Sequence, residues 1–366
     1  MDSKNALKTA MIGLRHGHMG KIGAEPSGYI GTFRQLEGVD VVAYCEDTDP
    51  SLLEPVHQFH PEARTYTSVD ALIEREDFDL AVVVLPACEI PEVGLKLAEA
   101  GKHFYMEKQF ARRSADLVEL VRAVRRNKVK VMPGYPHRFN PVCQELKKLV
   151  DQGVLGRPLD LEVRLITGQV RPGMRDPSSF LYTDAGEGGG ILHMLGCHYL
   201  EIMRFLMGCE IKAVQAMTGR PVGHIEEPLE DIAIAAFEYE NGAYGSMHAG
   251  YLQGVRGPYD QSLVYRGLDG EADWTPLGGP LLKVKSNAPE WRGAPERTVH
   301  SELAPGPPGY ASSVWMFNWI QDFIYRIQAD QEPALSIEDA LRVLQSIDAA
   351  YESARTGRRV EVEYRD

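Results

Sequence analysis

Residues 1–134 alternate between short apolar runs and amphipathic runs, and this alternation restricts the fold more than any other feature of the chain. Runs typical of buried strands lie at 8–14, 39–47, 78–86, 103–108 and 129–135. Helical runs separate them near 29–37, 90–102 and 114–128. Connections that contain a helix join parallel strands through right-handed crossovers. The sequence therefore predicts an α/β fold with a doubly wound parallel sheet in residues 1–134.

The pattern changes after residue 134. Runs that alternate apolar and polar residues predict long strands at 158–168, 211–219 and 231–251. Asn241-Gly242 predicts a hairpin within the last of them. Residues 266–310 are rich in Gly and Pro and predict irregular strands and loops, not a separate domain. We expect residues 135–366 to form an α+β domain with an open, mainly antiparallel sheet.

Two helical runs close the chain, near 313–329 and 337–356. The second follows Ser336, has Asp339 three residues later and stops at Gly357, which is the pattern of a helix capped at both ends. This last helix can pack back on the first domain.

Composition and charge narrow the function. The chain has 366 residues, 44% of them hydrophobic, and a formal net charge of -13, which disfavours a nucleic-acid partner. The apolar runs are too short for a signal peptide or a membrane span. Five cysteines show no metal-ligand spacing and suit a reducing compartment. We expect a cytoplasmic protein that acts on a small molecule, without a metal or a membrane.

A glycine-containing turn follows the first strand, where α/β sheets bind phosphate groups. A Rossmann dinucleotide site needs G-x-G-x-x-G at this point. Here Gly13, Gly17 and Gly20 are present, but Arg15 occupies the place of the second glycine and His16 follows it. The alternative is a turn that only needs positive backbone dihedrals.

The second strand ends in Glu46 and Asp47. A carboxylate at this strand end accepts the ribose hydroxyls of NAD and repels the 2′-phosphate of NADP. The sequence thus favours NAD, although Arg15 and His16 keep NADP possible because they can offset phosphate charge.

Three consecutive glycines, 188–190, open a helical run that carries Met194, His198 and Glu201 at neighbouring helical positions. Glycines allow close approach of another group, so the run predicts a ligand site with these side chains in a shared cleft. The alternative for His198 is a satisfied core histidine.

Three segments resemble the Gfo/Idh/MocA family of glucose-fructose oxidoreductase, inositol dehydrogenase and rhizopine-catabolism proteins. AEAGKHFYMEK at 98–108 is similar to A-L-x-A-G-K-H-V-x-x-E-K-P, and GGGILHMLGCHYLE at 188–201 to G-G-G-x-L-x-D-x-G-x-H-x-x-D. Residues 322–360 resemble the C-terminal signature of the family. The resemblance implies a Rossmann domain, an open-sheet domain that makes a homodimer or homotetramer, and NAD(P)-dependent chemistry on sugars and cyclitols.

Carried over by position, Lys108 and His198 are the catalytic pair that faces the nicotinamide and the reacting hydroxyl. Histidine can take a hydroxyl proton near neutral pH, and a lysine ammonium can stabilise the oxyanion that develops. The cofactor contacts expected together with the turn are Leu85, Pro86, Glu107 and Lys108.

The chain departs from the family pattern at Ile90, Gln109 and Met194, where the family has histidine, proline and aspartate. Loss of the aspartate removes a substrate anchor, for which Glu187, His193 or Asp184 can substitute. Met194 itself is then expected to line the substrate site.

YPHRFNP at 135–141 resembles the family hinge between the domains and predicts substrate contacts at Tyr135, His137 and Arg138. A guanidinium binds carboxylates or paired hydroxyls well, which favours Arg138. Arg175, in the loop before the glycines, is a weaker candidate.

The leading hypothesis is an NAD(P)-dependent oxidoreductase that transfers hydride between the nicotinamide and a secondary alcohol or ketone of a sugar, sugar acid or cyclitol. One alternative is redox-neutral elimination or glycoside cleavage through a transient keto-sugar. Another is a nucleotide-binding sensor or scaffold without catalysis.

Overall fold

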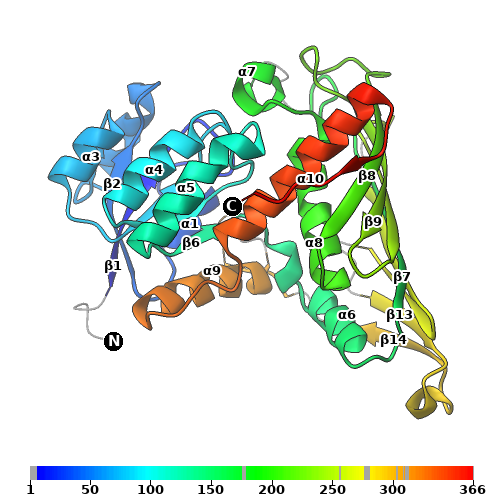
Figure 1. Cartoon of the computed structure of the whole chain (residues 1–366). Coiled ribbons are helices and arrows are strands. Elements are labelled where there is room, and N and C mark those ends of the chain that lie inside the picture. Colours follow the sequence, from blue (N-terminus) through cyan, green and yellow to red (C-terminus); the bar gives the residue numbers. More distant parts are fainter. Residues whose placement is uncertain are drawn as a thin grey trace.

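The computed structural model describes residues 6–174, 179–254, 257–275, 281–301, 304–307, 309 and 313–365. Arg175, a predicted substrate contact, lies outside these residues. Figure 1 shows two lobes, with a helical N-terminal lobe on one side and a large sheet on the other. Within the described residues, no helix is long and apolar enough to cross a membrane.

A parallel six-stranded sheet forms the centre of the N-terminal lobe and confirms the predicted doubly wound fold. In spatial order its strands are β3 (Arg64–Tyr66), β2 (Val39–Cys45), β1 (Leu7–Ile12), β4 (Leu80–Val83), β5 (His103–Met106) and β6 (Val131–Pro133). Its helices are α1 (Gly28–Phe33), α2 (Glu54–Phe59), α3 (Val69–Arg75), α4 (Ile90–Glu99) and α5 (Ser114–Asn127). The order reverses at β1, so the carboxyl ends of β1 and β4 flank the crevice where such sheets bind ligands.

The second lobe contains a nine-stranded, mainly antiparallel sheet, as predicted. Its order is β14 (Glu296–His300), β13 (Leu281–Ser286), β12 (Gly270–Trp274), β11 (Asp260–Gly267), β7 (Pro158–Ile166), β10 (Tyr244–Gly250), β9 (Ile232–Tyr239), β8 (Ile211–Gly219) and β15 (Val360–Glu361). Among the described strands of this second sheet, only the pairing of β7 with β10 is parallel. The Asn241-Gly242 hairpin joins β9 to β10, and Gly242 has a φ of +81°.

The prediction of irregular structure over 266–310 is wrong for much of that range. Strands β12, β13 and β14 pair in regular antiparallel register and extend the sheet. Each has only five or six residues, with Gly and Pro between them, so the periodic signal was too short to recognise.

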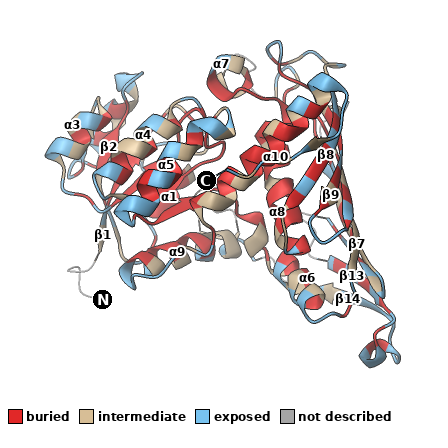
Figure 2. Ribbon diagram, in the orientation of Figure 1, coloured by how far each residue is buried: buried red, intermediate tan, exposed pale blue. Residues whose placement is uncertain are grey.

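The remaining helices follow residue 135 along the chain. They are α6 (Pro141–Asp151), α7 (Asp184–Glu187), α8 (Cys197–Met207), α9 (Val314–Gln328) and α10 (Ile337–Thr356). Helix α10 has the predicted bounds and capping box, and it packs against both α5 and β8 as it crosses between the lobes (Figure 1). Helix α8 is buried on nearly all sides, as Figure 2 shows.

Helix α9 packs on the N-terminal lobe, although the sequence placed it in the second domain. Trp319 is buried, stacks on Phe139 at 5.5 Å between ring centroids, and meets Tyr105 edge-on at 6.0 Å. Ile320 and Phe323 join the same apolar core. The tryptophan therefore anchors α9 in the apolar core of the N-terminal lobe.

Candidate active site

The turn after β1 brings the backbone close to the neighbouring strand and leaves space beside it. Gly13 has a φ of +86°, and a Cβ there would lie 2.4 Å from the carbonyl oxygen of Val84. A Cβ on Gly17 would meet nothing within 4 Å, so packing within the chain does not require that glycine. The turn thus fits a phosphate-bearing cofactor, because backbone N–H groups can be approached at Gly17.

No helix starts directly after this turn. Helix α1 begins only at Gly28 and has six residues, so it is shorter than the predicted run near 29–37. The intervening loop folds on itself, since a Cβ on Gly20 would lie 2.1 Å from the carbonyl oxygen of Ser27. The loop places the rings of His16 and His18 4.6 Å apart at the carboxyl edge of the sheet.

Glu46 forms hydrogen bonds with the backbone of its own chain. Its side chain is buried and accepts hydrogen bonds from the backbone N–H groups of Leu14 at 2.7 Å and Thr48 at 2.9 Å. The geometry therefore gives no support to Glu46 as a ribose ligand, because these bonds fasten it to the turn. The adjacent Asp47 is exposed at the same strand end.

Arg15 lies between two carboxylates. Its guanidinium is 3.3 Å from Glu46 and 2.7 Å from Glu89. Both pairings neutralise its charge, so it is a poor partner for an additional phosphate.

Glu107, at the end of β5, is buried among polar groups. It accepts a hydrogen bond from Tyr29 Oη and lies 3.4 Å from Nδ1 of His18. Burial acts to raise the pKa of this carboxyl, but His18 and Lys108 outweigh burial and bring the pKa to about 2. Glu107 is therefore a fixed anion that orients His18.

Lys108 points from the same strand end toward the helix that carries the glycines. Its Nζ lies 3.4 Å from the backbone carbonyl oxygen of Met194 and 3.7 Å from the Met194 sulfur. Gln109 follows a cis peptide bond and donates to the carbonyl oxygen of His193 at 3.0 Å. Among the described residues, no carboxylate forms an ion pair with Lys108, so its charge is available to a ligand.

His198, His137 and Tyr135 lie together. The His137 and His198 rings are 4.9 Å apart, and the Tyr135 ring is 5.7 Å from His198. Burial, together with His137 and Lys108, holds the pKa of His198 well below its ordinary value, and burial lowers the pKa of His137 to about 4. His198 is only partly buried, and its Nδ1 has no hydrogen-bond partner in the described structure. His198 is therefore a neutral imidazole that can accept a proton.

Arg138 and Glu201 do not reach this cluster. They form a buried ion pair, and the Arg138 guanidinium also lies 3.5 Å from Asp339 and over the ring of Phe205. The geometry therefore gives no support to Arg138 as a substrate contact or to Glu201 in the cleft with His198, because the two side chains pair with each other.

The glycine run is packed against the chain itself. A Cβ on Gly190 would lie 2.0 Å from the carbonyl oxygen of Glu230, whose carboxylate accepts the N–H groups of Gly190 at 2.8 Å and Leu192 at 2.9 Å. Tyr351 of α10 donates to the same carboxylate at 3.0 Å. Gly190 thus allows the carboxylate of Glu230 to cap the π-helical turn Leu192–Gly196. This turn leads directly into α8, which carries His198.

His193 gives no support to its predicted substrate contact. It is fully buried, and its Nε2 lies 3.1 Å from the carbonyl oxygen of Ala111. Burial, with Arg113, lowers its pKa to about 3, so it stays neutral as a core histidine.

The sequence analysis missed His18 and Glu230. His18 belongs to the turn that was analysed, and a second imidazole two residues after His16 was a usable signal. Glu230 had no such signal in the sequence, because its carboxylate accepts backbone N–H groups that lie 38 and 40 residues away.

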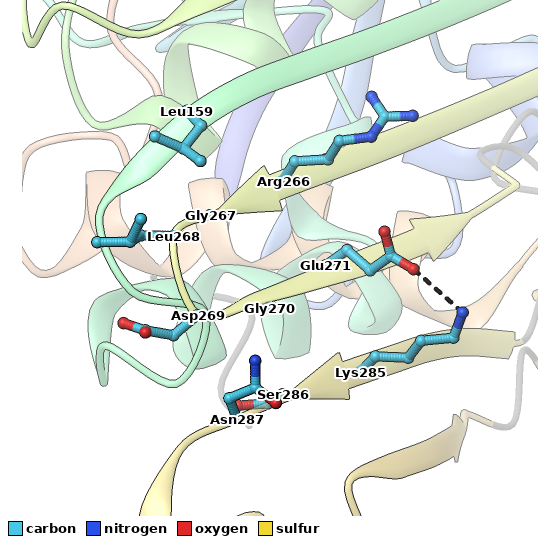
Figure 3. Close-up of a pocket in the computed structure, with 10 residues that line it drawn as sticks. All are labelled: Leu159, Arg266, Gly267, Leu268, Asp269, Gly270, Glu271, Lys285, Ser286 and Asn287. Atoms are coloured by element: carbon cyan, nitrogen blue, oxygen red, sulfur yellow. Dashed lines mark ion pairs between the residues drawn. The ribbon is translucent and has the colours of Figure 1, made fainter.

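A hollow of about 370 Å³ lies at the β11–β12 hairpin, away from all predicted site residues (Figure 3). Lys285 pairs with Glu271 at 3.1 Å across it, and Arg266 pairs with Asp160 at 2.6 Å. Because these charges are already compensated, the hollow is not a second candidate site.

Comparison with known proteins gives consistent matches along the chain. The model of an oxidoreductase family with an NAD-binding Rossmann fold matches residues 7–135, and that of the GFO/IDH/MocA C-terminal domain matches residues 143–272. D-apiose dehydrogenase of Paraburkholderia graminis is 26% identical over 347 residues, which cover 91% of this chain and 86% of the relative. Myo-inositol 2-dehydrogenase of Thermotoga maritima is 23% identical to this chain, and the match covers 98% of this chain and 99% of the relative.

A solved structure of levoglucosan dehydrogenase with NADH and levoglucosan has the same fold. It superposes with a TM-score of 0.84 over 98% of this chain and 100% of that chain, at 22% sequence identity.

Proposed function

Because the chain belongs to the Gfo/Idh/MocA family of NAD(P)-dependent oxidoreductases that act on CH–OH groups, we propose that it oxidises a secondary alcohol, or reduces the ketone, of a sugar, sugar acid or cyclitol. The named relatives act on D-apiose, myo-inositol and levoglucosan, all of which are polyhydroxylated rings or sugars.

The ammonium of Lys108 near the neutral imidazole of His198 is the observation that carries the proposal. Among the described residues, the ammonium forms no ion pair and donates to the carbonyl oxygen and the sulfur of Met194, and it lies near enough to His198 to lower the pKa of that ring. The ammonium can stabilise oxyanion character on the reacting oxygen, while the imidazole takes its proton.

NAD is the cofactor that these residues fit best. Gly17 leaves room for the pyrophosphate, Gly13 lets the turn pass close to Val84, and Leu85 and Pro86 follow β4 at the crevice. Asp47 is the exposed carboxylate available to the ribose, while Arg15 is already paired and cannot favour a 2′-phosphate. Bound NAD supplies the hydride acceptor, C4 of the nicotinamide.

Calorimetric titration with NAD and NADP, followed by absorbance at 340 nm with a panel of aldoses, aldonic acids and cyclitols, tests this function. We expect tighter binding of NAD than of NADP and accumulation of free NADH with at least one polyol. Substrate conversion without free NADH would overturn the proposal in favour of a redox-neutral cycle. Failure to bind either nucleotide would favour a sensor or scaffold.

We further propose that the protein is a homodimer or homotetramer joined through the open face of the nine-stranded sheet. Met217 on β8 lies directly opposite Ile234 on β9, and they are 68% and 41% exposed. Tyr244 on β10 is 62% exposed. Large apolar side chains clustered on a sheet face are typical of an interface between subunits.

A further inference from the structure

The N–H groups at the start of α1 are already used by the loop that precedes this helix. In other Rossmann sites, the helix after the first strand presents these groups to the pyrophosphate. Here the N–H of Tyr29 donates to the carbonyl oxygen of His18 at 2.9 Å. The N–H of Ile30 donates to the carbonyl oxygen of Met19 at 3.1 Å. The start of this six-residue helix is therefore not available to a phosphate.

Among the basic side chains of the turn after β1, His18 is placed to take over this role. Arg15 is held between two carboxylates, and His16 is buried. The side chain of His18 is 30% exposed. It lies next to Gly17 in the chain, where a Cβ would meet nothing within 4 Å. A ligand therefore has both room beside the turn and access to the imidazole.

His18 reaches from the turn after β1 to the end of β5. Its Nδ1 lies 3.4 Å from Oε1 of Glu107, the residue that precedes Lys108. Strand β4 lies between β1 and β5 in the sheet, so this contact spans the carboxyl end of β4. Open α/β sheets hold their ligands in the crevice at this edge. His18 thus lies between the glycine-containing turn and the proposed catalytic lysine.

Contacts on both sides fix the ring of His18 in the crevice. Its backbone N–H donates to Nδ1 of His16 at 2.9 Å. Its own Nδ1 is buried beside Glu107, so the exposed part of the side chain includes the rest of the ring, which carries Nε2. The other titratable groups around this pair are His16 on the turn, Tyr29 on α1, Tyr105 and Lys108 at the end of β5, and His198 on α8. With a proton on each nitrogen, the ring of His18 can donate to Glu107 and to a ligand oxygen at once.

We propose that His18 binds the pyrophosphate of NAD as an imidazolium that Glu107 holds in place. This inference rests on the proposed function, because it concerns the same cofactor. Nδ1–H donates to the carboxylate of Glu107, and Nε2–H donates to a phosphate oxygen. Hydrogen bonds between charged groups are stronger than those between neutral groups, so one imidazolium can offset the loss of the amides of α1. Lys108 then remains for the reacting oxygen.

His18→Gln tests the assignment, with Lys21→Gln as the matched control. Lys21 is an exposed cation three residues further along the same loop. Calorimetry measures the dissociation constants of NAD and of ADP-ribose, which keeps the pyrophosphate but lacks the nicotinamide. We expect His18→Gln to weaken the binding of both ligands by about 10–100-fold, the range for one hydrogen bond to a charged group. Lys21→Gln should bind both ligands as the wild type does.

Three outcomes of the titrations would overturn the inference. The first is unchanged binding of both ligands by His18→Gln. The second is a loss confined to NAD, because His18 would then contact the nicotinamide half of the cofactor. The third is an equal loss in Lys21→Gln, because the net charge of the loop would then account for the effect.

The ¹⁵N chemical shifts of the histidine rings in the wild-type protein give a second readout, which stands even if His18→Gln does not fold. In the complex with ADP-ribose, both ring nitrogens of His18 should carry a proton. A ring with one unprotonated nitrogen in this complex would contradict the proposal. If the wild type binds neither NAD nor ADP-ribose, the proposed function has itself failed, whereas wild-type binding that persists in His18→Gln removes only the role of His18.

Discussion

The ammonium of Lys108 lies 3.4 Å from the carbonyl oxygen of Met194 and 3.7 Å from its sulfur, where the family resemblance implies an aspartate side chain. A methionine is neutral, so the charge of Lys108 is not offset at this position. The lysine lowers the pKa of the neighbouring imidazole of His198 and can stabilise negative charge on a reacting oxygen. An uncharged contact thus lies where the family resemblance implies an anion.

The buried Arg138–Glu201 pair is expected to stabilise the hinge and not to bind substrate. Arg138→Met leaves the Glu201 carboxylate buried without its main partner, which should lower the free energy of unfolding by about 3–5 kcal/mol. The double variant Arg138→Met/Glu201→Gln should recover part of this loss. Urea unfolding measures both, and KM should stay near the wild-type value. A raised KM of Arg138→Met at unchanged stability would instead support Arg138 as a substrate contact.

Asp47 and Glu46 should respond differently to loss of their charge. Asp47→Asn removes the exposed carboxylate and should weaken NAD binding by about 10–100-fold, the range for one charged hydrogen bond. Glu46→Gln breaks bonds to Leu14 and Thr48, so it should lower the melting temperature. Calorimetry and thermal unfolding separate these effects. Weaker NAD binding in Glu46→Gln at unchanged stability would instead confirm Glu46 as the ribose ligand.

Acid should destabilise the protein through His193. The pKa of this ring is lowered from 6.5 to about 3 in the folded protein, so between these pH values the unfolded chain binds the extra proton. The free energy of unfolding therefore falls as pH falls, by up to about 1.4 kcal/mol per pH unit for this one group. His193→Gln can keep a bond to Ala111 and should show a smaller slope in urea unfolding between pH 6 and pH 4.5. Equal slopes would contradict burial of a neutral His193.

The exposed apolar face of β8–β10 should determine the oligomeric state. Met217→Glu combined with Ile234→Glu places two adjacent charges on this face and should shift the protein to monomers in light scattering. Leu268→Glu, an exposed apolar residue at the β11–β12 turn, is the matched control and should leave the mass unchanged. An unaltered mass in the double variant would exclude this face as the interface.

Much of the fold could be predicted because its signals are local. The strands β1, β2, β4 and β5 are mainly apolar runs, and α10 carries its capping residues at both ends. Strand β3 was missed because it has three residues, none of them buried. The loop before α1 was also missed, since its path depends on glycines that pack against each other.

The site residues stay predictions. Motif positions indicated Lys108 and His198, and the structure places His137 and Tyr135 beside His198. The partners of Glu46 and Arg138 could not be predicted, because they come from residues 32 and 63 positions away that only the tertiary fold brings near. A side chain that satisfies another in the folded protein has the same sequence pattern as one that awaits a ligand.

Lys108 and His198 are proposed to act on the reacting hydroxyl and not on cofactor binding. The most direct measurement is kcat for NADH formation with the best polyol of the panel, beside the NAD dissociation constant, in Lys108→Met and His198→Asn. We predict that kcat falls by about 10²–10⁴-fold in each variant while NAD affinity stays within a few-fold of wild type. Undiminished kcat in either variant, or loss of NAD binding that accounts for the whole effect, would contradict the assignment.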